Sequence, residues 1–366
     1  MREYQQCTRC VMDTLIDPEI TFNHEGHCQY CEAAISRSGS VYFPNEVGHQ
    51  KLNEMLREIK EYGKNKKYDC IMGLSGGLDS SYLAYLGYQW GLRVLLIHID
   101  DGFDTEISQK NLAKLVKATG YDYEVIKPDA EQYNALTAAY MRAGLPNLAV
   151  PQDSVLFAYI YDRMIKYNIR YFLSGGNFAS ESIMEGRINY TAGDSVNIRA
   201  INAAFGTKPI NKLKFLDYRK IYLNLKLLKH KYVYPLNYVD YKRERAFAEL
   251  AQFCDFQYYG SKHLENAFTA FLQIVWYPKK FDLDKRKGHL SSLIVAGDIT
   301  REQAIEELAH PVCSEEQLNT YISLVKEKLG ISDDEYERIM AAPTRMHTDF
   351  KTEKDTLFYK IRHMKK

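Results

Sequence analysis

Residues 68–90, YDCIMGLSGGLDSSYLAYLGYQW, constrain the fold of this chain more than any other stretch. An apolar run, 68–74, passes through the loop SGGLDSS into a segment, 80–90, whose apolar residues follow helical spacing. In parallel α/β sheets, a strand that enters a helix through a loop of small residues presents backbone N–H groups to phosphate. The stretch therefore predicts a buried strand, a phosphate-binding loop and a helix in direct succession.

Further apolar runs alternate with helical patterns after this unit. We expect strands at 92–104, 121–127 and 169–177, and helices at 105–120, 130–143 and 153–167. Alternation at this spacing predicts an α/β fold with a doubly wound parallel sheet and right-handed crossovers. Ligands of such sheets bind at the carboxyl ends of the strands, where SGGLDSS, HIDDGFD and SGGN all fall.

The loop SGGLDSS offers glycines, hydroxyls and one carboxylate, and we expect these residues to bind phosphate: Ser75, Gly76, Gly77, Asp79, Ser80 and Ser81. The glycines let backbone N–H groups approach an anion closely, and the hydroxyls add donors. A carboxylate facing phosphates fits if Mg2+ lies between them. The sequence has no G-x-x-x-x-G-K-[ST] motif, which excludes the standard site for γ-phosphate hydrolysis. The alternative is a Ser- and Gly-rich helix cap without a ligand.

Four of the seven cysteines form two C-x-x-C pairs, CTRC and CQYC, near the start of the chain. Such pairs predict a structural zinc ribbon, over residues 1–45, whose four thiolates close a tetrahedron. Residues 11–27, between the pairs, are expected to form a short hairpin. Two disulfides are the alternative, which a reducing cytosol disfavours. The predicted zinc ligands are Cys7, Cys10, Cys28 and Cys31.

Charge and hydropathy exclude several classes of protein. The 366 residues carry 48 Lys+Arg against 47 Asp+Glu, a net charge of +1, which argues against a dedicated nucleic-acid or membrane-surface protein. No apolar run approaches the ~18 residues of a membrane span. The first residues, MREYQQCTRC, lack the apolar region of a signal peptide. We therefore expect a cytoplasmic protein without membrane or nucleic-acid partners.

The last third of the chain predicts a helical lobe with two charged clusters. We expect an ATP-binding α/β domain over 46–235, with an irregular insertion plus a helix at 181–231, and a mainly helical lobe over 236–366. Two helices after residue 297 begin with capping boxes, at Thr300 and Ser314. The segments SKHLEN and DKRKGHL offer candidate catalytic groups, although charge clusters alone also fit a solvated helix face. These candidates are Lys262, His263, Glu265, Arg286 and His289.

The string SGGLDSS resembles the pyrophosphate loop of the PP-loop ATP pyrophosphatase superfamily, which cleaves ATP between the α- and β-phosphates and adenylates an oxygen of the second substrate. The resemblance implies that Ser75, Gly76, Gly77, Asp79 and Ser80 hold the departing pyrophosphate and Mg2+. It also implies further ATP-binding residues beyond the loop. Those around the nucleoside and on the other side of the loop would be His98, Asp100, Gly175 and Asn177.

A second resemblance covers most of the chain. The segments CTRCVMDT, SGGLDSSYLA, HIDDGFD, YGSKHLENAFTAFLQ and PKKFDLDKRKGHLSSLI together resemble the N-acetyl sugar amidotransferases of bacterial surface polysaccharide and flagellin glycan pathways. Membership implies conversion of the acetamido group of a nucleotide-linked N-acetyl sugar to an acetamidino group, for example for lipopolysaccharide O-antigen. It also implies catalytic roles for Asp79, Lys262, His263, Glu265 and Arg286.

The source of ammonia is expected to be a separate protein. Outside the ribbon, Cys70 falls in a predicted strand, and Cys254 and Cys313 lack the surroundings of a glutaminase nucleophile. The resemblance implies a glutaminase and cyclase-like pair as the ammonia-delivering partner. Two alternatives stay open: a tRNA-thiolating PP-loop enzyme, and a zinc-ribbon assembly module whose nucleotide loop is regulatory.

Overall fold

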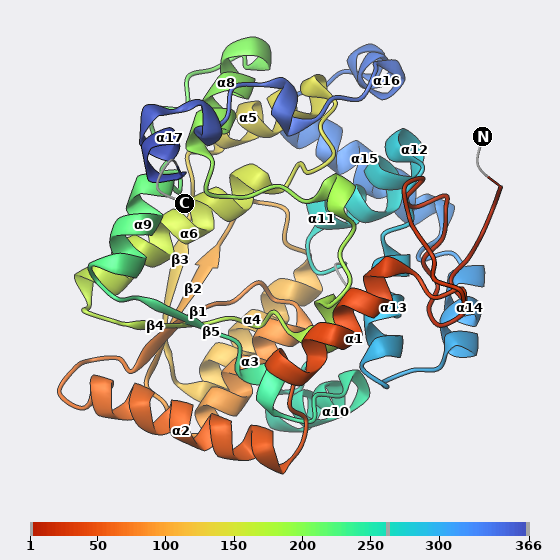
Figure 1. Cartoon of the computed structure of the whole chain (residues 1–366). Coiled ribbons are helices and arrows are strands. Elements are labelled where there is room, and N and C mark those ends of the chain that lie inside the picture. Colours follow the sequence, from red (N-terminus) through yellow and green to blue (C-terminus); the bar gives the residue numbers. More distant parts are fainter. Residues whose placement is uncertain (1–2, 261–263, 364–366) are drawn as a thin grey trace.

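The computed structural model describes residues 3–260 and 264–363, apart from the side chain of residue 187 (Figure 1). A five-stranded parallel sheet with the strand order β3-β2-β1-β4-β5 forms its centre. The order reverses beside β1, as in a doubly wound sheet, which confirms the predicted fold class. The strands are β1 (Cys70–Gly73), β2 (Val94–Ile99), β3 (Asp122–Ile126), β4 (Tyr171–Leu173) and β5 (Lys231–Val233).

Successive side chains of the central strands pack alternately in two separate hydrophobic cores. In β1, Met72 packs in a core with helices on one side of the sheet, whereas Ile71 packs against a helix on the other side. This alternation follows from the two-residue period of a strand. The first side carries α2 (Glu46–Gly63), α3 (Leu78–Gln89), α4 (Glu106–Thr119) and α10 (Arg243–Cys254); the second carries α6 (Val150–Lys166).

Several helix boundaries lie where the sequence places them. Thr105 caps α4 by accepting a hydrogen bond from the Ser108 N–H, and Gly120 ends it in the left-handed conformation, with φ +66°. Both predicted capping boxes are present. They begin α14 (Arg301–Ala309) at Thr300 and α15 (Glu315–Leu329) at Ser314.

Two local expectations were wrong. Residues 181–231 are more regular than the predicted insertion with one helix, because they contain two helices, α8 (Ser195–Phe205) and α9 (Tyr218–Lys226), and the first residue of the edge strand β5. A three-residue strand gives almost no periodic signal. Residues 11–27 do not form one hairpin; instead, bridges join Gln6 to Asp13 and Phe22 to Cys28, so each cysteine pair has its own turn.

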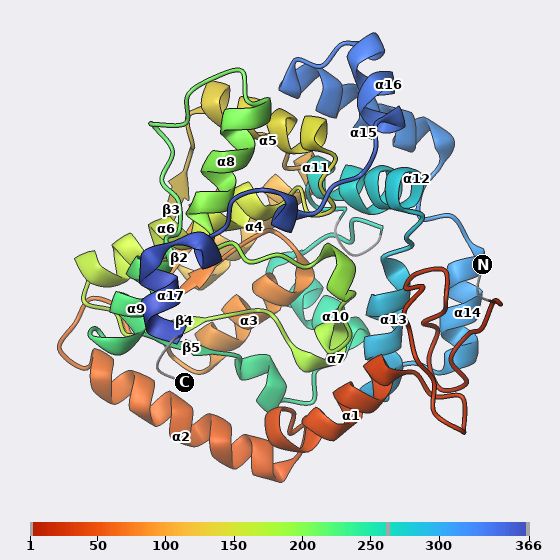
Figure 2. The same cartoon turned by 45° about the horizontal axis from the view of Figure 1, so that its top comes forward.

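The remaining helices surround the sheet or belong to the C-terminal lobe (Figure 2). They are α1 (Gln29–Val41), α5 (Ala130–Ala143), α7 (Phe178–Glu181), α11 (Ala267–Phe271), α12 (Tyr277–Phe281), α13 (Arg286–Val295), α16 (Asp333–Ala341) and α17 (Leu357–His363), with a π-helical turn, η3 (Leu272–Trp276), between α11 and α12. In both views the N-terminal segment, in red, lies beside α13 and α14. The domain limits 1–45, 46–235 and 236–366 stay a prediction. Across the described ranges, no helix combines the length and the apolar character needed to cross a membrane.

Candidate active site and zinc centre

The loop after β1 has the geometry of an anion-binding turn. Gly76 has φ +82°, and a Cβ atom there would lie 2.1 Å from the Ser108 hydroxyl oxygen, so only glycine fits. The Ser75 and Ser80 hydroxyl oxygens lie 3.0 Å apart, at the start of α3. Gly77 occupies the N-cap of α3 without a side-chain cap, so the first N–H groups of this helix are directed at the loop.

A second glycine loop approaches the first from the end of β4. A Cβ atom on Gly175 would lie 3.0 Å from both the Cα and the N atom of Ser80, which requires a glycine. Gly175 therefore lies beside the phosphate loop, as predicted. Asn177 is buried, and its side chain caps α7 by accepting a hydrogen bond from the Ser180 N–H at 2.9 Å. Its role in ATP binding stays a prediction. Ser81 is buried too, and it lies outside the cavity described below.

The end of β2 and the segment after it form a buried ion pair. His98 Nδ1 lies 2.8 Å from the Leu74 carbonyl oxygen, and its Nε2 lies 2.8 Å from Asp104 Oδ2. Burial lowers the pKa of His98, but Asp104 outweighs it, so the net shift of this pKa is upward. Asp100 lies apart, 2.9 Å from Lys127 Nζ, which lowers the pKa of this carboxyl, and it does not line the cavity.

The same segment is tied to the start of the C-terminal lobe. The Asn266 amide donates to Asp101 at 3.1 Å and to Asp104 at 3.3 Å. The Thr105 N–H donates to the Glu265 carbonyl oxygen at 3.0 Å. A Cβ atom on Gly77 would lie 2.8 Å from Glu265 Oε1, so the Glu265 carboxyl lies beside the phosphate loop. The predicted residues Lys262 and His263 lie outside the described residues.

A cavity of about 670 Å³ extends from the phosphate loop to the C-terminal lobe. This volume is within the usual range for small-molecule sites, ~300–1,000 Å³. One wall comes from the loop and from the ends of β1, β2 and β4; the opposite wall comes from α11, η3 and α13. Of the predicted residues, those that line it are Ser75, Gly77, Asp79, Ser80, His98, Gly175, Glu265, Arg286 and His289.

Two tyrosines complete the phosphate loop from distant parts of the sequence. The Tyr241 hydroxyl donates to Asp79 Oδ1, and the Leu78 N–H donates to the Tyr259 hydroxyl oxygen at 2.8 Å. Burial, followed by the charge of Asp79, raises the pKa of Tyr241, so its hydroxyl stays protonated and fixes the carboxylate. Sequence reasoning missed both residues, because no local pattern relates either tyrosine to the loop.

The basic cluster 285–287 is largely committed to protein carboxylates. The Lys285 ammonium contacts buried Glu185, and the Lys287 ammonium contacts buried Asp13. The Arg286 guanidinium donates to Asp284 at 2.7 Å and also to the His310 carbonyl oxygen at 2.7 Å, near the end of α14. Of these contacts, the one between Lys287 and Asp13 joins the lobe to the ribbon. A catalytic role for Arg286 stays a prediction, although this residue does border the cavity.

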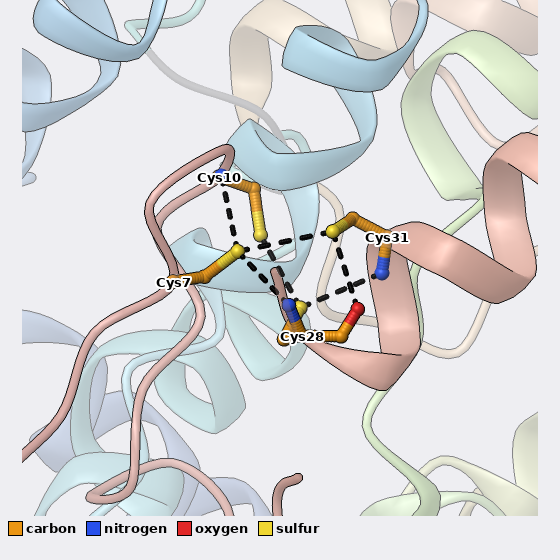
Figure 3. A group of neighbouring side chains, drawn as sticks. All are labelled: Cys7, Cys10, Cys28 and Cys31. Carbon is orange, nitrogen blue, oxygen red and sulfur yellow. Dashed lines mark hydrogen bonds between the residues drawn. The ribbon is translucent and has the colours of Figure 1, made fainter. Parts of the chain in front are cut away.

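The four predicted zinc ligands meet in one buried cluster (Figure 3). Their Sγ atoms all lie within 4.8 Å of one another, with 3.8 Å between Cys7 and Cys31 and 3.5 Å between Cys10 and Cys28. Zn–S bonds of ~2.3 Å in a tetrahedron require S–S distances of about 3.8 Å. The cluster therefore fits Zn2+.

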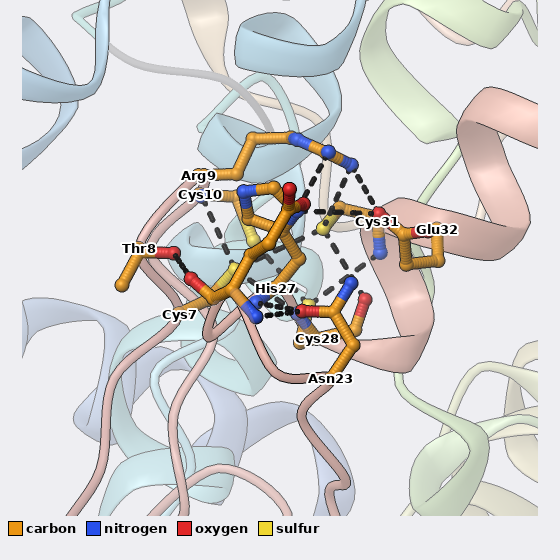
Figure 4. Close-up of polar contacts among 10 residues, drawn as sticks. Cys7, Thr8, Arg9, Cys10, Asn23, His27, Cys28, Cys31 and Glu32 are labelled. Atoms are coloured by element: carbon orange, nitrogen blue, oxygen red, sulfur yellow. Dashed lines mark hydrogen bonds and ion pairs between the residues drawn. The ribbon is translucent and has the colours of Figure 1, made fainter.

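Charged groups surround the cluster without joining it (Figure 4). Arg9 NH1 lies 3.8 Å from Cys31 Sγ and also pairs with Glu32, and Arg9 NH2 lies 2.7 Å from His27 Nδ1. The Arg9 charge partly offsets the charge that four thiolates would bring. With all four positions taken by sulfur, this centre would leave no site for water, which is typical of a structural zinc.

The ribbon is anchored to the C-terminal lobe at α13 and α14. The Val11 N–H donates to the Ser291 hydroxyl oxygen at 3.2 Å, and Arg301 Nε donates to the Cys10 carbonyl oxygen at 3.1 Å. Val11 also packs in a small core with Leu290 and Leu293 of α13. Folding of the ribbon and placement of α13, which borders the cavity, are thus linked.

Comparisons with known proteins give one family match. Residues 265–365 match the family model described as LPS biosynthesis protein WbpG-like, C-terminal domain. A search of curated proteins finds no match.

Among solved structures, an NMN synthetase from Francisella tularensis is 14% identical, covering 77% of this chain and 95% of its own, with TM-score 0.34. An NH3-dependent NAD synthetase from Campylobacter jejuni subsp. jejuni NCTC 11168, in complex with nitrate ion, is 16% identical, covering 62% and 96%, with TM-score 0.30. A predicted subunit of tRNA methyltransferase from Methanocaldococcus jannaschii is 16% identical, covering 50% and 75%, with TM-score 0.28. At this level of similarity, the solved structures do not identify any functional residue of this chain.

Proposed function

Residues 265–365 belong to the C-terminal domain family of WbpG-like lipopolysaccharide biosynthesis proteins, and from this premise we propose that the chain is an ATP-dependent amidotransferase. Its second substrate would be a nucleotide-linked N-acetyl sugar, whose acetamido group becomes an acetamidino group. One observation carries the proposal: a single cavity has the phosphate loop on one wall and the family-matched domain on the other. ATP and the sugar would therefore meet inside it.

The proposed reaction has two steps. The amide oxygen of the sugar attacks the α-phosphorus of ATP, the bond to the β-phosphate oxygen breaks, and pyrophosphate leaves. Ammonia then adds to the imidate carbon, the C–O bond breaks, AMP leaves, and the nitrogen loses a proton to give the amidine. No protein nucleophile is required; the protein positions the substrates and excludes water, which would merely restore the amide.

The chain's own groups suit the first step. The N–H groups at the start of α3 and the Ser75 and Ser80 hydroxyls are placed to bind the departing pyrophosphate. Asp79, held by Tyr241 in the first turn of α3, is the carboxylate that would hold Mg2+. The bound ion would neutralise phosphate charge. The structural zinc would act through the fold alone.

The ammonia would come from a separate glutaminase and cyclase-like pair. Burial raises the pKa of Cys70, of Cys254 and of Cys313, whereas a cysteine nucleophile needs a lowered pKa. The ribbon thiols are taken by the zinc cluster. These observations support an external source. Because ATP and nucleotide sugars are cytoplasmic metabolites, we place the enzyme in the cytoplasm, in the synthesis of lipopolysaccharide O-antigen or a related glycan.

The test is a reconstitution of the purified chain. It is incubated with Mg-ATP, ammonium chloride and a panel of UDP- and CMP-linked N-acetyl sugars, while AMP, pyrophosphate and the mass of the sugar are followed. We expect AMP release with one sugar, which becomes lighter by the difference between oxygen and NH. No AMP with any sugar would contradict the proposal. AMP release on adding tRNA and a sulfur donor would favour a tRNA-thiolating enzyme instead.

A further inference from the structure

Among the described residues, one carboxylate on the cavity wall has no hydrogen-bond or ion-pair partner. Asp153 lies in the first turn of α6, is exposed, and faces the cavity. Across the described ranges, its carboxylate forms no hydrogen bond or ion pair. Two other carboxylates that line the cavity do have partners, because Asp79 accepts from Tyr241 and Asp104 pairs with His98.

Asp153 lies where the sheet domain meets the family-matched domain. Burial raises the pKa of Tyr277 in α12, and the charges of Glu185 and Asp153 add to this rise. The neighbouring Gln152 donates to Asp101 Oδ2 at 2.8 Å, and Asp101 in turn accepts from Asn266. The cavity wall provided by the C-terminal lobe includes Thr269, Gln273 and Pro278.

An unpaired carboxylate disfavours phosphate groups nearby and favours a cation. The proposed reaction creates positive charge at nitrogen: at the amide nitrogen once its oxygen is adenylated, then at the attacking nitrogen as an alkylammonium group, and finally over the protonated amidine. A planar amidinium and a carboxylate can form two parallel N–H···O bonds, as arginine does with carboxylates. Ammonia and its adducts are thus the chemical class that fits this position.

We propose that Asp153 is the general base of the second step: its carboxylate takes the proton that the attacking ammonia nitrogen must lose. In the balanced step, nitrogen donates its electron pair to the imidate carbon, one N–H proton passes to Asp153, and the C–O bond breaks to release AMP. This inference rests on the proposed function and adds a catalytic residue to it. Asp153 takes no part in adenylation.

The test separates the two half-reactions in Asp153→Asn. Sugar-dependent exchange of labelled pyrophosphate into ATP, without ammonia, reports adenylation; amidine formation with ammonium chloride reports the complete reaction. A general base contributes about 100-fold or more. We expect exchange within a few-fold of the unaltered enzyme, amidine formation lower by about 100-fold or more, and AMP release that continues because water restores the amide.

The control is Asp162→Asn, on the same helix, where Asp162 pairs with Lys214 at 2.6 Å and lies outside the cavity. It should match the unaltered enzyme in both assays. Because Asp153 has no partner to lose, Asp153→Asn should also unfold no earlier on heating. Equal amidine formation in Asp153→Asn and the unaltered enzyme would overturn the inference, and so would a parallel loss of exchange, which would indicate nucleotide binding instead. If the unaltered enzyme shows no sugar-dependent exchange, the proposed function itself fails.

Discussion

The zinc ribbon and the phosphate loop are both built on short turns, but they are completed in different ways. All four ribbon ligands fall between Cys7 and Cys31. The phosphate loop is completed by Tyr241, Tyr259 and Glu265, which are distant in sequence. A site closed by local ligands depends on its own sequence, whereas the loop depends on how the C-terminal region packs against it. Changes in the ribbon should therefore mainly lower the stability of the protein, and changes in the loop should mainly lower its activity.

The largest effect is expected from opening the ribbon. Cys31→Ser removes one of four thiolates, and structural zinc contributes about 10 kcal/mol or more to isolated zinc domains. We expect loss of bound zinc and early proteolysis of the N-terminal segment, measured by metal analysis and limited digestion. Cys254→Ser, outside the cluster, is the matched control and should keep its zinc. Unchanged zinc content in Cys31→Ser would contradict the assignment.

Asp79→Asn should lower activity and leave zinc binding and stability unchanged. Loss of the carboxylate that would hold Mg2+ should lower sugar-dependent pyrophosphate exchange by about 1,000-fold, while zinc content and thermal stability stay the same. Asp100→Asn is the comparison, because Asp100 pairs with Lys127 outside the cavity and should retain most activity. A larger loss of pyrophosphate exchange in Asp100→Asn than in Asp79→Asn would contradict the assignment of Asp79 as the carboxylate that would hold Mg2+.

Lys287→Met tests the contact that joins ribbon and lobe. It leaves the buried Asp13 carboxylate without its ammonium partner, which should lower the free energy of unfolding by about 3 kcal/mol. Denaturant unfolding measures this change. The double variant Asp13→Asn/Lys287→Met should recover most of the loss, because no isolated charge stays buried. A phosphate-binding role for Lys287 would instead appear as weaker nucleotide binding with normal stability.

Tyr241→Phe tests how distant residues tune the loop. Removing a hydrogen bond to a charged group costs about 1.5–3 kcal/mol, so the half-saturating Mg2+ concentration in the exchange assay should rise by about tenfold or more. The fold should be unaffected, because the ring is retained. An unchanged Mg2+ dependence would show that Tyr241 does not position Asp79.

The smallest effect concerns the pair of His98 and Asp104. The net shift of the His98 pKa is upward in the folded state, so this pair contributes stability fully below the usual value of 6.5 and loses it as pH rises through the higher folded pKa. Denaturant unfolding of the unaltered chain and of His98→Gln across this range measures the difference. The difference in the free energy of unfolding between the two proteins should become smaller as pH rises. A difference that does not depend on pH would contradict a charged pair.

What the sequence predicts follows the same division between local and distant contacts. Regular strand and helix alternation, the caps at Thr105 and Thr300, and the cysteine cluster all depend on residues close together in the chain. The partners of Asp79 and Lys287 do not, because packing alone brings Tyr241 and Asp13 to them. Charge patterns in 285–287 resembled a phosphate site, yet buried carboxylates that no local pattern reveals are the partners of Lys285 and Lys287.

The central claim is that the amide oxygen of the sugar attacks the α-phosphate of ATP. The most direct measurement uses a nucleotide-linked N-acetyl sugar with 18O in the acetyl carbonyl, followed by mass spectrometry of AMP after turnover with ammonium chloride. The account predicts that 18O appears in AMP and is absent from pyrophosphate. Retention of 18O in the sugar product, or unlabelled AMP, would contradict it.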